Sequence, residues 1–209
     1  MSTTQTSSSH GKLIVAVIAA ALVVVLALVS AFIWPGWALN KGDEASTQGT
    51  TTSQGASQDA SEPTTPSIDA VALPDDASEL LKAMPDSVLN FARTKADAST
   101  SWSGASPVEE YTLTYSTGKD GQGITLKVAQ WSQSDDAQSQ YDNLTGAMTG
   151  KELGSGNVKV SGKTTGAYSA KADPDDDTKA VAVWRNDTVV FYATGAKNDI
   201  QRFYQQFPL

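Results

Sequence analysis

The sequence predicts an α+β domain with a mostly antiparallel sheet and packed helices, preceded by one transmembrane helix and a disordered stalk. Three observations support this: an apolar run near the N-terminus, a polar segment after it, and then short alternating segments separated by turns. Period-two alternation indicates half-buried strands, and short turns between them indicate antiparallel hairpins. We expect a short cytoplasmic tail at 1–12, the transmembrane helix at 13–37, the stalk at 38–67 and an extracytoplasmic domain at 68–209.

The apolar run from Leu13 to Trp34 contains one clearly polar residue, Ser30. As a helix it would span about 33 Å, close to the hydrocarbon thickness of a bilayer. The alternative is a cleaved signal peptide, because Val29, Ser30 and Ala31 resemble a cleavage site. The run is longer than a usual signal peptide core. We therefore expect an uncleaved anchor whose partner is the lipid bilayer through residues 13–34.

The flanking charges define the orientation weakly, because Lys12 and Lys41 lie on opposite sides of the anchor. From Lys41 to Ser67 there is no large apolar residue, so this segment cannot bury a core and is predicted to be a disordered spacer. The spacer and the larger C-terminal part favour the tail inside the cell and the domain outside. The predicted location is the cell membrane, with a single pass.

In the N-terminal half of the domain, a short helix is predicted over Ala77–Met84, and Pro85 ends it. The segment 88–96 is ambiguous between helix and strand, and we favour an edge strand. Residues 108–116 and 124–128 alternate cleanly around a glycine-rich turn and predict a hairpin.

A second helix is predicted after a cap at Ser132 or Ser134, running to Met148. Short strands at 158–160 and 164–170 follow, around a turn.

The last hairpin is predicted over 180–184 and 188–194, with Trp184 facing Val189 across a turn at Asn186 and Asp187. Both of its faces are apolar. The strands are therefore either covered on both sides, or one face meets a ligand or partner. The chain then forms a final helix from about 196 to 207.

Composition excludes several kinds of chemistry. The chain has no cysteine, and its one histidine, His10, precedes the anchor. A domain across the membrane from His10 has no Ser–His or Cys–His nucleophile pair and none of the usual zinc ligand sets. Net charge is −8 and no basic run is present, which argues against nucleic acid. Carboxylate and serine–lysine chemistry stay open.

Trp131, Trp184 and Tyr192 are the candidate partner surface, because aromatic side chains supply large contact area with a polar handle. Core packing is the alternative for each of them. We predict no catalytic, cofactor-binding or metal-binding residue.

Three polar motifs have ordinary structural interpretations. The acidic run 173–177 could attract calcium but lacks EF-hand spacing, so a solvated loop is favoured. Asn143 and Asn186 each begin a glycosylation sequon that we expect to be idle. Glu109 and Glu110 point to opposite faces of a strand and are interpreted as surface charge.

The anchor, the Ser/Thr stalk, the VAVWRNDTVVFYATG hairpin and the DIQRFYQQFPL helix together resemble membrane-anchored exported proteins of high-GC Gram-positive bacteria. The order of elements from 68 to 209 is also similar to the PsbP-like fold of some exported lipoproteins, although the lipid-attachment cysteine of those proteins is absent. The resemblance implies an extracytoplasmic location and assigns no functional residue.

We therefore predict a non-enzymatic, membrane-tethered module that binds a ligand or a cell-envelope protein. The alternatives are an accessory or sensory subunit of a membrane complex, and a cell-envelope enzyme that uses carboxylates.

Overall fold

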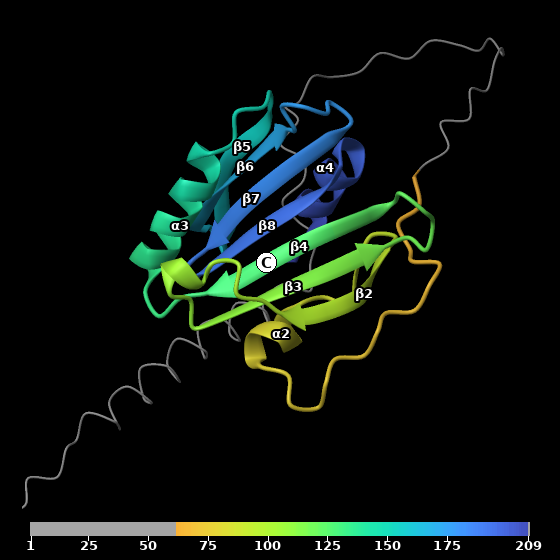
Figure 1. Ribbon diagram of the computed structural model, residues 1–209, viewed down its shortest axis with the longest axis horizontal. Helices are drawn as coiled ribbons and strands as arrows, with labels where there is room; N and C mark the ends of the chain where they lie inside the picture. Colours follow the sequence, from red (N-terminus) through yellow and green to blue (C-terminus); the bar gives the residue numbers. More distant parts are fainter. Residues whose placement is uncertain (1–61, 209) are drawn as a thin grey trace, which may run out of the picture.

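The computed structural model describes residues 62–208, whose strands form one antiparallel sheet (Figure 1). The strands are β1 (Ser87–Val88), β2 (Phe91–Ala98), β3 (Glu109–Ser116), β4 (Gly123–Gln130), β5 (Glu152–Val160), β6 (Lys163–Ala172), β7 (Lys179–Asn186) and β8 (Val189–Ala196). The helices are α2 (Glu79–Ala83), α3 (Ser134–Gly146) and α4 (Lys197–Gln206), with a 3-10 turn, η1 (Ser103–Ala105). The order across the sheet is β1-β2-β3-β4-β8-β7-β6-β5. The predicted class, α+β with a mostly antiparallel sheet, is confirmed.

Much of the predicted membrane topology falls outside the described residues. The tail 1–12, the transmembrane helix 13–37 and the stalk as far as residue 61 all lie there. Between residues 62 and 208, no helix has both the length and the apolar character needed to cross a membrane.

The described chain begins in contact with the domain. The carboxylate of Glu62 pairs with Arg202 Nε on α4 at 2.7 Å, and Arg202 Nη2 donates to the Pro63 carbonyl at 2.7 Å. Ser67 Oγ donates to the Thr117 carbonyl beside the β3–β4 turn at 3.0 Å. The sequence analysis assigns residues 62–67 to the stalk, whereas here these polar contacts hold the segment against the domain.

Strands β7 and β8 are covered on both sides. On one face, Phe203 of α4 and Phe207 just after it pack with Trp184 and Phe191 in the larger core. The opposite face carries a second cluster, which joins α3 to the sheet through Ala129, Trp131, Ala137, Tyr141, Val183 and Val190. Both faces are apolar because a helix covers each, which is the first alternative of the sequence analysis.

The β7–β8 hairpin has a register two residues away from the predicted one. Trp184 pairs with Phe191 rather than with Val189, and Asn186 pairs with Val189. The turn therefore starts at Asp187, which has a φ of 52°. A shift of two residues keeps every side chain on its predicted face, because the side-chain period of a strand is also two.

The segment 88–96 is a strand, as favoured, but it is broken near its start. Leu89 has a φ of 52° and separates β1 from β2, which pair with each other. Because β1 occupies the edge, β2 is not the edge strand that the sequence suggested.

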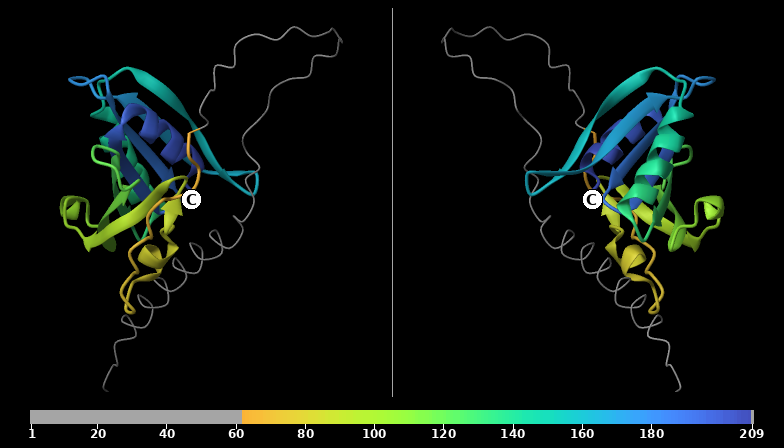
Figure 2. Two further views of the ribbon diagram at one scale, coloured as in Figure 1. Left: turned by 90° about the vertical axis from the view of Figure 1, so that its right-hand side faces the viewer. Right: turned by 90° about the vertical axis from the view of Figure 1, so that its left-hand side faces the viewer.

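The other edge strand, β5, starts at Glu152 and is longer than predicted. It pairs only with β6, and Figure 2 shows the β5–β6 hairpin projecting from the rest of the domain. Gly154 and Gly156 lie in β5, where a Cβ on Gly156 would approach the Tyr168 ring to 2.9 Å. Residues 154–157 of this strand are Gly, Ser, Gly and Asn, so its apolar pattern was too weak to predict its full length.

Candidate functional site

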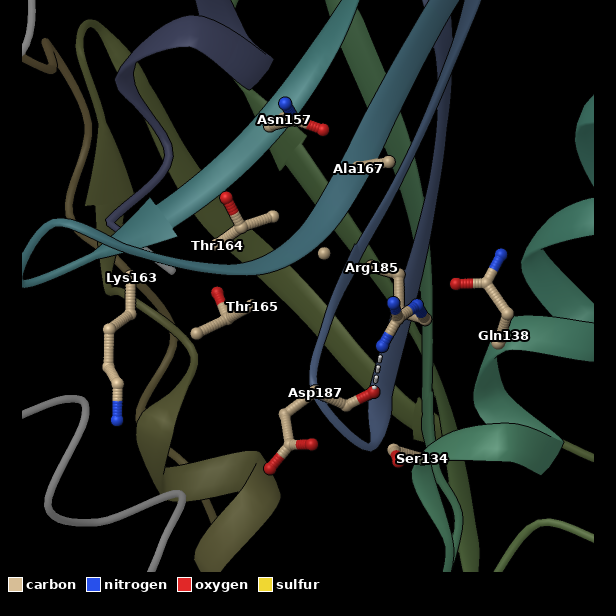
Figure 3. A pocket seen from close by; sticks show the side chains of 10 residues that line it. Ser134, Gln138, Asn157, Lys163, Thr164, Thr165, Ala167, Arg185 and Asp187 are labelled. Atoms are coloured by element: carbon tan, nitrogen blue, oxygen red, sulfur yellow. Dashed lines mark hydrogen bonds between the residues drawn. The ribbon is translucent and has the colours of Figure 1, made fainter.

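A hollow of about 590 Å³ lies where α3 begins, between the β5–β6 hairpin and the β7–β8 turn (Figure 3). Most of the side chains that line it are polar: Ser134, Gln138, Asn157, Lys163, Thr164, Thr165, Arg185 and Asp187, with Gly166 and Ala167 completing the wall. No aromatic side chain lines it, so it lacks the stacking platform that nucleobases or sugars usually find. None of these residues was proposed as a site residue from the sequence.

Arg185 lines the hollow from β7. It follows Trp184 in β7 and therefore points to the opposite face, toward α3, beside the cluster of Val183 and Tyr141. Its Nη1 donates to the Asp187 carbonyl at 2.8 Å (Figure 3). Its Nε is buried and has no hydrogen-bond partner. The guanidinium thus makes one hydrogen bond with the described chain.

The positive charge of Arg185 acts on Tyr141 of α3. Burial raises the pKa of the Tyr141 phenol above its ordinary value, and the nearby Arg185 charge opposes that rise. The same wall carries Gln138, whose amide nitrogen donates to Asp142 at 2.7 Å, and Figure 3 shows its oxygen on the side of Arg185.

The first turn of α3 lies beside the hollow, and no side chain caps it. The N-cap residue is Gln133, not Ser132 or Ser134 as predicted, and its side chain makes no capping hydrogen bond. Asp135 and Asp136 follow in the first turn and favour the helix dipole. Free backbone N–H groups at a helix start are donors for a polar or anionic group.

Strand β6 forms the opposite wall by approaching β7 closely. A Cβ on Gly166 would lie 1.7 Å from the Arg185 carbonyl oxygen, so this position accepts only glycine without movement of the backbone. The neighbouring Thr165 carbonyl accepts a hydrogen bond from the Asp187 N–H at 2.8 Å. These contacts fix the β7–β8 turn against β6 and hold the rim of the hollow in place.

A second, smaller hollow of about 390 Å³ lies between η1 and α3. Gly104 and Ala105 line it on one side, and Asp136, Ser139, Gln140 and Asn143 line it on the other.

The three predicted aromatic residues do not form one surface. Trp184 is 3% exposed and stacks on Phe191 in the core beneath α4, with ring centroids 4.9 Å apart. Trp131 is 1% exposed, and Tyr192 is half-buried on the opposite face. Trp102, which the sequence analysis missed, lies between these two, at 6.3 Å from Trp131 and 6.4 Å from Tyr192.

Glu110 positions Trp102. Its carboxylate accepts hydrogen bonds from Ser99 Oγ at 2.7 Å, from the Ser101 N–H at 2.9 Å and from the Trp102 N–H at 2.9 Å. Glu110 is 6% exposed, so its interpretation as surface charge is wrong. Glu109 does point the other way and accepts from the Tyr111 hydroxyl at 3.1 Å.

The acidic run forms a turn with its own hydrogen bonds. Asp173 accepts from the backbone of Asp175 and Asp176. Hydrogen bonds from Thr178 and Lys179 lower the pKa of Asp176 to about 2. Within residues 62–208, no group of three or more acidic or histidine side chains is arranged to hold a metal ion.

The structure also shows where the two sequons and a Ser-x-x-Lys motif lie. Asn186, which begins a sequon, is 7% exposed, whereas Asn143 is exposed on α3. Ser116 and Lys119, which the sequence analysis missed, have the Ser-x-x-Lys spacing of some serine hydrolases. They lie at the β3–β4 turn, where Ser116 Oγ accepts from the Gly118 N–H at 3.0 Å.

No protein-family model matches the sequence, and no curated protein matches it. Among solved structures, a GTP-binding regulator from Thermotoga maritima is similar over 56% of this chain and 75% of its own. The two are 8% identical and the TM-score is 0.37. At this distance the likeness carries no argument about function.

Proposed function

We propose that this protein is a membrane-tethered, extracytoplasmic binding module whose ligand site is the hollow beside Arg185. The apolar run at 13–34 would supply the tether, and the proposal takes the domain to be non-enzymatic.

The observation that supports the proposal is the position of the hollow relative to the start of the described chain. Ser67 bonds to Thr117 at the β3–β4 turn, and Ile124 after this turn pairs with Gly195. Gln130 at the other end of β4 pairs with Val189, next to the β7–β8 turn. Figure 1 shows these two turns at opposite ends of the sheet. A tether attached near Ser67 would therefore leave the hollow at the end of the sheet opposite to the attachment point, where the tether does not cover it.

Site-specific crosslinking in the native membrane tests this proposal. A photoreactive residue at Thr164, which is exposed on the rim of the hollow, should give an adduct with a cell-envelope component that mass spectrometry can identify. The matched control carries the same residue at Asp120, which is exposed in the β3–β4 turn. Adducts from Asp120 alone, or from neither position, would overturn the proposal.

A further inference from the structure

Arg185 differs from the other arginines of the described chain in its charge partners. Arg93 pairs with Asp86 at 2.7 Å, and Arg202 pairs with Glu62 at 2.7 Å. Among residues 62–208, no carboxylate lies within ion-pair distance of Arg185. Figure 3 shows the Asp187 carboxylate turned away from the guanidinium, which bonds to the Asp187 backbone instead. A half-buried guanidinium without an anion is therefore left facing the hollow.

The two other guanidinium nitrogens also lack protein partners. Nε is buried and unbonded, which is a costly arrangement for a charged donor. Nη2 makes no hydrogen bond with residues 62–208 and is not among the buried atoms, so it is open to the hollow. The charged guanidinium thus presents Nη2 to the hollow as a free donor, and a guanidinium donor binds carboxylate and phosphate oxygens well.

The surroundings suit an anion of this kind. Lys163 at the rim adds a second positive charge, and Ser134 and Thr164 supply hydroxyl groups. The uncapped first turn of α3 begins at Ser134 and adds the positive end of a 13-residue helix. The opposing charges are those of Asp187 on the rim, of Asp135 and Asp136 in the helix turn, and of Asp142, which accepts from Gln138. None of these carboxylates lies within ion-pair distance of Arg185.

From these observations we infer that the hollow binds an oxyanion, either a carboxylate or a phosphate group of the ligand, on the guanidinium of Arg185. This inference rests on the proposed function, because it names the chemistry of the group that the hollow receives. Arg185 holds the oxyanion and the hydroxyl groups orient it.

Titration calorimetry on the full-length protein in detergent micelles tests the inference, with inorganic phosphate and succinate as separate probes at constant ionic strength. At least one anion should bind, and its identity tells phosphate from carboxylate recognition. Arg185→Gln should weaken binding at least tenfold. Arg185→Lys should weaken binding less, because the positive charge remains although the planar guanidinium is lost.

The matched control is Lys159→Gln, which removes one positive charge from an exposed position of β5 outside the hollow. It should change the affinity by less than threefold. Equal weakening by Lys159→Gln and Arg185→Gln would overturn the inference, because binding would then follow net charge. If Arg185→Gln fails to fold, an unchanged affinity in Arg185→Lys would equally overturn recognition by the guanidinium group.

The outcomes also separate the two proposals. If neither anion binds while Thr164 still crosslinks to an envelope component, the inference falls and the proposed function stands. If an anion binds through Arg185 but Thr164 gives no adduct, the proposed cell-envelope function falls and the anion site stands.

Discussion

Arg93 is 2% exposed, and every partner of its guanidinium is an oxygen of the N-terminal part of the domain. Nη1 donates to the Met84 and Pro85 carbonyls, and Nη2 donates to the Val71 carbonyl and the Asp86 carboxylate. The side chain thus joins β2 to the segment before it and to the end of α2. A buried charge is tolerated here because hydrogen bonds satisfy its donors.

Arg93→Leu should lower the free energy of unfolding by about 3 kcal/mol, because it leaves three carbonyl groups without their donor. Urea unfolding measures the change. Asp86→Asn is the control: Asp86 is 79% exposed, and the loss of its charge should cost less than about 1 kcal/mol. Equal losses in both variants would mean that the ion pair, not the carbonyl network, is the important contact.

Glu110 shows the same principle in a carboxylate. It accepts three hydrogen bonds from residues 99–102, and this loop carries Trp102 onto Trp131. The alternation of β3 correctly predicted the face of the strand on which Glu110 lies. That pattern contains no information on the loop 99–102, which folds over Glu110.

At the scale of elements, strand alternation was the most reliable signal. The hairpin of β3 and β4 and the two faces of β7 and β8 were predicted from period-two patterns, and the pairings confirm them. The register of the β7–β8 hairpin was wrong by two residues. Asn186 and Asp187 both tolerate turn conformations, so local sequence alone does not decide which of them begins the turn.

The close approach of β6 and β7 gives a prediction at the same scale. Gly166→Ala should lower the free energy of unfolding by roughly 3 kcal/mol, since its Cβ would lie 1.7 Å from the Arg185 carbonyl and the strands must separate. Chemical denaturation checks the value.

A matched glycine provides the control for this prediction. Gly146→Ala, at the end of α3, has no atom within 4 Å of the new Cβ and should stay within about 1 kcal/mol of the wild type. If both variants unfold alike, the wall that β6 builds beside Arg185 is not as closely packed as the structure shows.

For the molecule as a whole, the first described residues and the hollow lie at different places on the sheet. Residues 62 and 63 contact α4, Ser67 reaches the β3–β4 turn, and the hollow lies at the β7–β8 turn. With the proposed anchor, this arrangement leaves the hollow at the end of the sheet opposite to the point where the tether would attach.

The absence of cysteine in the sequence allows a direct test of the proposed orientation. Thr164→Cys should react with a membrane-impermeant maleimide in intact cells, because Thr164 is exposed on the domain proposed to lie outside. Ser8→Cys, in the proposed cytoplasmic tail, should react only after the membrane is permeabilised. If Ser8→Cys but not Thr164→Cys is labelled in intact cells, the topology is the opposite of the proposed one.

The sequence by itself determined the α+β class, the faces of the strands and most of the helices, because alternation and helical spacing are local properties. It did not determine the candidate site. Arg185 appeared only as one residue of an apolar hairpin, and the hollow around it comes from α3, β6 and the β7–β8 turn. Only the tertiary structure decided which side chains meet there, because those elements are distant in sequence and their contacts are polar and backbone-mediated. Strand alternation, a local property, already separates Trp184 from Tyr192. Only the tertiary structure decided that Trp102 lies against Trp131 and Tyr192, because the loop that carries it is distant from Tyr192 in sequence.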